Sequence, residues 1–161
     1  MLILNKYTKD QYTQLENTVV KISKSCKTLT PRSLTEVRKW LDFNFVFYAY
    51  ENESVVGWVV SEPVDSTTFE IKSLYAVPEF SRKGIGNALI KEVSKNPLFN
   101  YISATYNPIV LHILEENNFE VVNLIKLPKK TLYAYLKTRK TSALFKGIRR
   151  KVYICYKKTN V

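Results

Sequence analysis

The hydrophobic positions change their spacing along the chain, and each spacing predicts a different kind of element. Apolar residues fall on one helical face over residues 9–25 and again over residues 30–43. In the second helix Thr30 would act as the N-cap and Pro31 would occupy the first turn. Residues 45–50 and 55–60 are rich in aromatic and β-branched side chains on either side of the turn "ENES", which predicts a β-hairpin.

Strands and helices alternate in the second half of the chain. Residues 67–77 predict a strand ended by Pro78, residues 84–94 a helix and residues 98–106 a further strand. Asn107 would cap a short helix that Asn117 and Asn118 end. These elements predict a mixed α/β fold with helices on both faces of one sheet.

The C-terminal quarter is less regular in its pattern. Residues 119–126 and 151–158 predict two more strands, because apolar and polar residues alternate in the second of them. The segment between, residues 131–148, fits either a helix or a second hairpin, and we expect the helix. A length of 161 residues favours one domain over residues 1–161.

Composition excludes several classes of protein. No apolar run is long enough for a membrane helix, and the start of the chain does not have the pattern of a secretory signal. Two distant cysteines, Cys26 and Cys155, predict reduced thiols and a cytoplasmic location rather than a disulfide framework. His112 is the only histidine, lies on the last well-patterned helix and has no expected partner, so we predict neither a metal site nor a catalytic role for it.

The net charge of +11 is concentrated at one end of the chain. Residues 1–120 contain 13 Lys/Arg and 14 Asp/Glu, whereas residues 121–161 contain 12 Lys/Arg and no acidic residue. This basic segment, residues 121–161, favours an anionic partner, with RNA as one candidate. A solvated surface or a rim that attracts an anionic cofactor explains the same charge.

The stretch "PEFSRKGIGNALIKEV", residues 78–93, carries the strongest chemical signal. It contains two of the four glycines, next to Arg82 and Lys83, at a junction between a strand and a helix. Glycines at such a junction let backbone N–H groups approach an anion, and the start of the helix adds its dipole. The alternative is an ordinary solvated turn.

With its neighbours, this stretch resembles the GNAT N-acetyltransferase superfamily. The family's acyl-CoA motif has the form Gln/Arg-x-x-Gly-x-Gly/Ala after a strand, and here it reads "SLYAVPEFSRKGIGNAL", with Ser81 in the Gln/Arg position. A second landmark is an Asn about twelve residues before Gly-Phe, which Asn107 and Phe119 match with Asn118 in place of the glycine. The resemblance implies the GNAT fold, whose mostly antiparallel mixed sheet is splayed between strands 4 and 5.

The resemblance also implies acetyl-CoA as co-substrate, without a metal. Backbone amides at the start of the helix would bind its pyrophosphate, and strand backbone would pair with its pantetheine. The cofactor-binding residues implied in this way are Leu74, Tyr75, Ala76, Val77, Arg82, Lys83, Gly84, Ile85, Gly86, Asn87 and Asn107.

Two residues are candidates for proton transfer. Glu70 matches a catalytic glutamate in the histone-acetylating branch of the family, and it would share a strand face with Lys72 and Leu74. The alternative for Glu70 is a strand residue paired with Lys72. Leu114 stands where the family has a general-acid tyrosine. Tyr101 and Tyr106 could replace that tyrosine, and we choose Tyr106 as the candidate acid. The alternative is that the departing thiolate needs no general acid.

These residues predict an enzyme that transfers an acetyl group to a primary amine by direct attack in a ternary complex. The amine belongs to a small molecule or a protein, and the basic segment disfavours a polycation because like charges repel. The alternative is a GNAT-like module that senses acyl-CoA or binds nucleic acid without turnover. The sequence leaves open whether the protein forms a homodimer.

Overall fold

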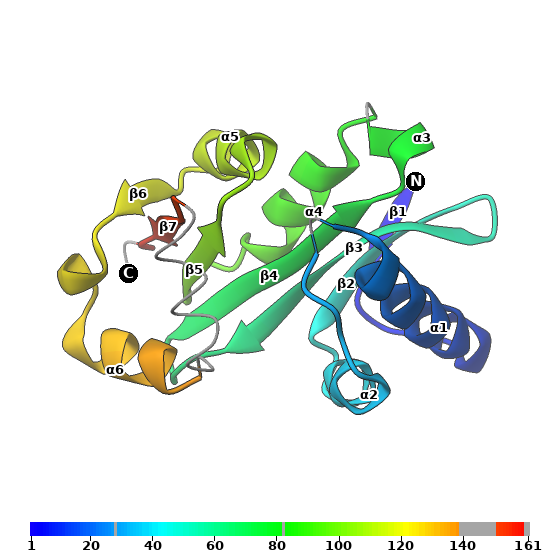
Figure 1. Cartoon of the computed structure of the whole chain (residues 1–161), viewed down its shortest axis with the longest axis horizontal. Helices are drawn as coiled ribbons and strands as arrows, with labels where there is room; N and C mark the ends of the chain where they lie inside the picture. Colours follow the sequence, from blue (N-terminus) through cyan, green and yellow to red (C-terminus); the bar gives the residue numbers. More distant parts are fainter. Residues whose placement is uncertain (28, 82, 139–150, 160–161) are drawn as a thin grey trace. The chain divides into compact units, whose positions relative to one another are not determined.

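The computed structural model describes residues 1–27, 29–81, 83–138 and 151–159 (Figure 1). The predicted order of elements is confirmed, with three short additions: a first strand, a single helical turn after the fourth strand, and a 3₁₀ turn. The elements are β1 Leu2–Leu4, α1 Lys9–Ser25, α2 Leu34–Asp42, β2 Val46–Glu51, β3 Ser54–Pro63, β4 Thr68–Ala76, α3 Pro78–Ser81, α4 Ile85–Val93, β5 Asn100–Thr105, α5 Pro108–Glu116, β6 Glu120–Val122, η1 Leu124–Lys126, α6 Lys129–Lys137 and β7 Tyr153–Lys157.

The strands pair in the order β1-β2-β3-β4-β5-β7-β6, which confirms the mixed, mostly antiparallel sheet. β1 with β2, β2 with β3, β5 with β7 and β6 with β7 are antiparallel. β4 and β5 are parallel, and their register runs from Thr68↔Asn100 to Ile71↔Ser103. The chain divides into two compact units: unit 1 is Met1–Ser61 with Ser73–Val93, and unit 2 is Glu62–Lys72 with Ser94–Val161.

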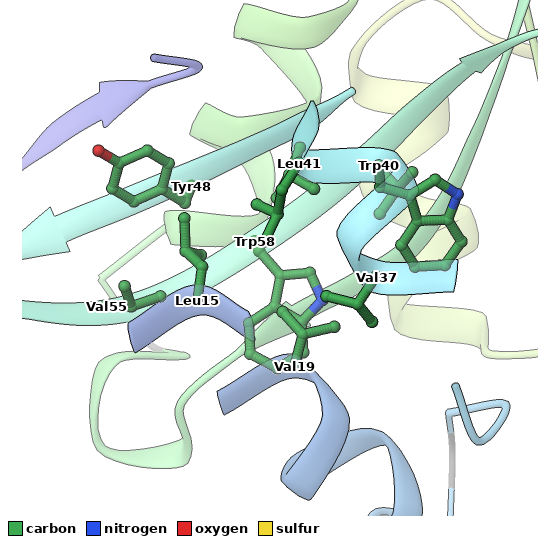
Figure 2. Close-up of a cluster of buried hydrophobic side chains, with 10 residues drawn as sticks. Leu15, Val19, Val37, Trp40, Leu41, Tyr48, Val55 and Trp58 are labelled. Carbon is green, nitrogen blue, oxygen red and sulfur yellow. The ribbon is translucent and has the colours of Figure 1, made fainter. Parts of the chain in front are cut away.

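The core of unit 1 lies between α1, α2 and one face of the β2–β3 hairpin. Trp40 on α2 and Trp58 on β3 are 1% and 0% exposed, so both tryptophans are core residues. Figure 2 shows side chains from all four elements meeting in this cluster. Its members are Leu15, Val19, Val37, Trp40, Leu41, Val46, Tyr48, Val55, Trp58 and Val60.

The opposite face of the same hairpin receives α4. Side chains alternate along a strand, so Gly57 faces away from its neighbour Trp58. A Cβ built at Gly57 would lie 2.9 Å from Ile85 Cγ2 and 2.8 Å from the carbonyl oxygen of Tyr75. Ile85 itself is 0% exposed. The absence of a side chain at position 57 therefore lets the start of α4 and the end of β4 approach β3, and unit 1 has helices on both faces.

The helix ends follow local capping, with one correction. Thr8 caps α1 in a capping box with Gln11. The predicted N-cap Thr30 of the second helix is wrong: Ser33 caps α2, and its hydroxyl accepts from the Glu36 amide at 3.2 Å. Residues 30–32 are not helical, and the Arg32 amide donates instead to the buried hydroxyl of Ser23 at 3.0 Å.

Five residues other than glycine have positive φ angles in the part of the chain that the structure describes. Asn52 and Glu53, at 50° and 59°, form the two-residue turn between β2 and β3. Ser73 has a φ of 56° inside β4. This residue interrupts the pleat, so the expected shared strand face of Glu70, Lys72 and Leu74 does not extend beyond Lys72.

Unit 2 is built around β5, which pairs with β4 on one side and with β7 on the other. A small core joins Ile102 on β5 with Leu127 and with Tyr135 on α6. α6 confirms the expected helix for the part of residues 131–148 that the structure describes. The strand predicted over residues 119–126 is wrong in its second half: β6 covers Glu120–Val122, whereas Leu124–Lys126 form the 3₁₀ turn η1, which Asn123 caps. The strand predicted over residues 151–158 is β7.

Candidate active site

The chain between β4 and α4 makes a compact turn in unit 1. The amide of Val77 donates to Val56 O on β3 at 2.9 Å. Phe80 then donates to Val77 O at 2.9 Å, and Lys83 to Phe80 O at 3.0 Å. Two successive turns therefore bring the chain from the end of β4 directly to Gly84 and the first residue of α4.

Gly84 is the residue in this turn that needs glycine. Its φ is 73°, a conformation that side-chain-bearing residues rarely adopt, and a Cβ there would meet no atom of the described residues within 4 Å. The Ala88 amide donates to Gly84 O at 3.0 Å, which is the first i→i−4 bond of α4. The amides of Ile85 and Gly86 precede that bond, so they belong to the donors that a helix leaves at its start. Open space beside such donors suits an anion.

Charge at this turn comes from Lys83. Its side chain is 57% exposed, its Nζ lies 3.5 Å from Glu51 Oε1, and it lies 4.6 Å from the centre of the Phe80 ring. The first turn of α4, Ile85-Gly86-Asn87, carries no acidic side chain that would repel an anion. The predicted contact from Arg82 and any contribution of the Ser81 side chain lie outside the described residues.

The predicted pantetheine-binding segment, Leu74–Val77, also belongs to unit 1. Its residues are half-buried, and the Tyr75 ring packs on Trp58 with 4.6 Å between ring centres. Burial raises the pKa of the Tyr75 hydroxyl, and nearby Cys26 and Glu79 raise it further. Unit 1 thus brings together every described residue of the predicted cofactor set except Asn107.

Glu70, the candidate base, lies in unit 2. It is 5% exposed, stands opposite Ile102 in the β4–β5 register, and its Oε2 lies 4.0 Å from Lys72 Nζ. The same Nζ lies 2.5 Å from Glu62 Oε2. Glu70 is therefore buried, and it also has Lys72 as the partner that the alternative interpretation of Glu70 as a paired strand residue predicts.

The remaining candidates lie in unit 2, on β5 or after it. Asn107 caps α5 as predicted, because its Oδ1 accepts from the Ile109 amide at 2.9 Å. Tyr106 is 41% exposed. Tyr101 is 2% exposed and donates to Asn96 O at 3.3 Å, and burial raises its pKa. Leu114 is fully buried on α5.

His112 is exposed on α5 as expected, but the expectation that it has no partner is wrong. Its Nε2 lies 3.4 Å from Oε1 of Glu116, one helical turn later. The pair has 72% and 47% of its side-chain surfaces exposed. An ion pair this exposed contributes little and indicates a surface contact, not a catalytic dyad.

One functional candidate escaped the sequence reasoning. Arg32, between α1 and α2, donates from Nη2 to Ser73 Oγ at 3.1 Å and thereby reaches the kinked residue of β4. Arg32 belongs to no motif, and Ser73 has no local signal for a positive φ.

A family model supplies the decisive comparison with known proteins. The model described as "Acetyltransferase (GNAT) family" matches residues 14–97, more than half of the chain. The chain belongs to the GNAT acetyltransferase family. The match includes most of α1, all of α2, the hairpin, β4 and the Gly84 turn, so it covers the predicted cofactor residues 74–87 but not Asn107. No curated protein sequence matches the chain.

Solved structures share the GNAT fold with this member. Rv2747 from Mycobacterium tuberculosis, in complex with CoA, has a TM-score of 0.76 at 12% identity over 100% of both chains. N-acetylglutamate synthase from Neisseria gonorrhoeae, complexed with coenzyme A and N-acetyl-glutamate, has a TM-score of 0.68 at 13% sequence identity. The match covers 99% of this chain and 35% of the synthase chain. Arabidopsis thaliana Naa50, in complex with the bisubstrate analogue CoA-Ac-MVNAL, has a TM-score of 0.63 at 15% sequence identity. The match covers 98% of this chain and 97% of the Naa50 chain.

Two searches of the described residues bear on other functions. No group of three or more His, Cys, Asp or Glu side chains in residues 1–27, 29–81, 83–138 and 151–159 could hold a metal ion. In that same part of the chain, no helix combines the length and apolar character that crossing a membrane requires.

Proposed function

We propose that this GNAT member is an N-acetyltransferase that binds acetyl-CoA and transfers its acetyl group to a primary amine. The amine attacks the thioester directly while both substrates are bound. The proposal takes residues 1–161 as one catalytic domain with the basic segment 121–161 at its end.

The observation that carries the proposal is the turn at Gly84. A positive φ, open space beside the glycine and the leading amides of α4 provide donors for a pyrophosphate without any side chain. Lys83 adds a charge that can bond to phosphate oxygens. Arg82 and Asn87 complete the proposed loop, and the backbone of Leu74–Val77 would hold the pantetheine.

In the proposed reaction Glu70 accepts the proton of the attacking amine, directly or through water, and Tyr106 protonates the departing thiolate. A carboxylate is one of the side chains that serve as a general base in proton transfer, and Glu70 places one in β4. The exposure of Tyr106 leaves its hydroxyl able to reach a substrate. Asn107 is proposed to contact the cofactor while capping α5.

A module that binds acyl-CoA without turnover is the second candidate. The buried Leu114 favours it, because the position that carries a general-acid tyrosine in the family here belongs to the core. An anionic partner, RNA included, is proposed for the basic segment. If RNA binds through several phosphate contacts, its affinity must fall steeply with salt.

Calorimetric titration with acetyl-CoA, followed by measurement of thiol release over a panel of amines, tests the proposal. We expect binding together with thiol release for at least one amine. The panel should include amino acids and short peptides, because the relatives named above were solved with N-acetyl-glutamate and with a peptide-containing analogue. Binding without release for every amine would favour the module instead.

Two matched variants test the turn itself. G84A adds a Cβ at a φ of 73°, and N44A replaces a residue with a φ of 54° at the turn after α2. Both strain the backbone in the same conformational region. We expect G84A to weaken acetyl-CoA binding and N44A to leave it unchanged. Equal affinities for the two variants would remove the turn from the cofactor site.

A further inference from the structure

A kink divides β4 into two halves. The first half, Thr68–Ile71, pairs with β5, and the last pair of that ladder is Ile71↔Ser103. Ser73 follows two residues later with a φ of 56°. Serine adopts this region at an energetic cost, and residues held there against their preference concentrate at functional sites. The second half, Leu74–Ala76, leads into the turn at Gly84.

Arg32 holds the side chain of the kinked residue. Its Nη2 donates to Ser73 Oγ at 3.1 Å, while its Nη1 lies 2.8 Å from Glu36 Oε1. The guanidinium lies 5.0 Å from the centre of the Trp40 ring. The Arg32 side chain is only 17% exposed. A planar cation with a carboxylate, an indole face and a hydroxyl around it has one orientation, so it can act as a fixed support for Ser73.

We propose that Arg32 is a positioning residue for acetyl transfer: by holding the kink at Ser73, it fixes the backbone of Leu74–Ala76 against the cofactor. The inference rests on the proposed function, because that function assigns this backbone to the pantetheine. Without Arg32 the segment would relax toward regular strand conformations, since nothing about serine itself favours a positive φ. The thioester would then be misplaced, and small misplacements of reacting groups cost large factors in rate.

The test uses R32M, S73G and the double variant in the full chain. Methionine keeps a long apolar stem over Trp40 but removes every donor. Glycine adopts positive φ readily, so in S73G the kink no longer depends on Arg32. R38M is the control, because Arg38 forms its ion pair with Glu16 of α1. Two readouts apply: hydrogen exchange of the amides of residues 73–76, and kcat and KM for acetyl transfer.

We expect R32M to speed exchange at residues 73–76 and to lower kcat by about 10- to 100-fold. In the S73G background, R32M should have little further effect on exchange or kcat. The effects of two substitutions that act through the same element are not additive. R38M should match the wild type in both readouts. A purely structural Arg32 would lower the melting temperature but would give the same loss of kcat in both backgrounds.

Three results would overturn the inference. Unchanged exchange at residues 73–76 in R32M would show that Arg32 does not hold the kink. Equal losses of kcat with and without S73G would show that it acts elsewhere. A higher KM for the amine with kcat unchanged would make Arg32 an acceptor-binding residue. If the wild type releases no thiol with any amine, the proposed function fails, whereas the exchange measurement still decides whether Arg32 holds Ser73.

Discussion

Adding one methyl group at Gly57 tests the packing that positions the candidate site. Gly57 lies in β3, and an alanine Cβ there would be 2.8 Å from Tyr75 O and 2.9 Å from Ile85 Cγ2. Both distances are shorter than carbon atoms tolerate, and one of the two atoms belongs to the backbone. G57A must therefore displace the end of β4, the start of α4 or β3 itself.

The magnitude follows from two opposing effects. Overpacking a filled site costs about 1–3 kcal/mol, and the rigid backbone contact favours the upper half of that range. Replacing glycine in a strand by alanine returns about 0.5–1 kcal/mol, because the unfolded chain loses conformational freedom. We therefore expect G57A to lower the free energy of unfolding by about 2 kcal/mol, or the melting temperature by about 4–8 °C in a chain of this size.

Urea unfolding, with the slope compared between variants, is the assay. The double variant G57A/I85L removes Cγ2 from Ile85 and should recover part of the loss, but not all of it, since the contact with Tyr75 O remains. G57A should also weaken acetyl-CoA binding, because it displaces the segments assigned to the cofactor. A G57A protein as stable as the wild type would refute the close approach of β4 and α4 to β3.

Three further predictions concern single residues. E53G should raise the free energy of unfolding by about 1 kcal/mol in thermal or urea unfolding, because Glu53 has a φ of 59° in a two-residue turn that favours glycine, whereas E53A should gain nothing. Burial raises the pKa of Asp65, but hydrogen bonds from Thr67, Thr131 and Thr68 outweigh it and hold the pKa below its ordinary value. This stabilisation is present above the unfolded pKa of about 3.9 and is lost as the pH falls through the folded value, so acid unfolding curves of D65N should lack that part of the slope. Burial raises the pKa of the Cys155 thiol to about 11, so a thiol reagent at about pH 8 should label the half-buried Cys26 and leave Cys155 unmodified until the protein unfolds.

Local sequence signals were sufficient for most of the fold. The period of the apolar residues identified α1. The same period, together with Gly84 or Asn107 at the start of the helix, identified α4 and α5. β1 was missed because three apolar residues at the start of a chain have no periodicity to measure. Its strand conformation comes from its pairing with β2, which no short window of sequence contains.

The start of α2 shows tertiary structure deciding between two local signals. Thr30 followed by Pro31 and Ser33 followed by Glu36 are both good beginnings for a helix. The helix begins at the second. The Arg32 amide bonds to Ser23 Oγ and its guanidinium reaches Ser73, and neither contact fits a helix that starts at Pro31. The later start therefore leaves Arg32 in a loop, free to support β4.

The same comparison explains why the turn at Gly84 could be predicted and the kink in β4 could not. Asn118, after α5, and Gly84, before α4, have φ angles of 65° and 73°. Asparagine and glycine both accept that region, so the sequence itself predicts a turn at each position. Ser73 adopts a φ of 56° without any such preference. A conformation that the residue does not favour must be imposed by its surroundings, and here Arg32, 41 positions away in the chain, donates a hydrogen bond to the Ser73 hydroxyl. A residue such as Gly84, whose type suits its conformation, can therefore be found from the sequence. Where a strained residue is held by a side chain distant in the sequence, as Arg32 holds Ser73, neither residue carries a local signal.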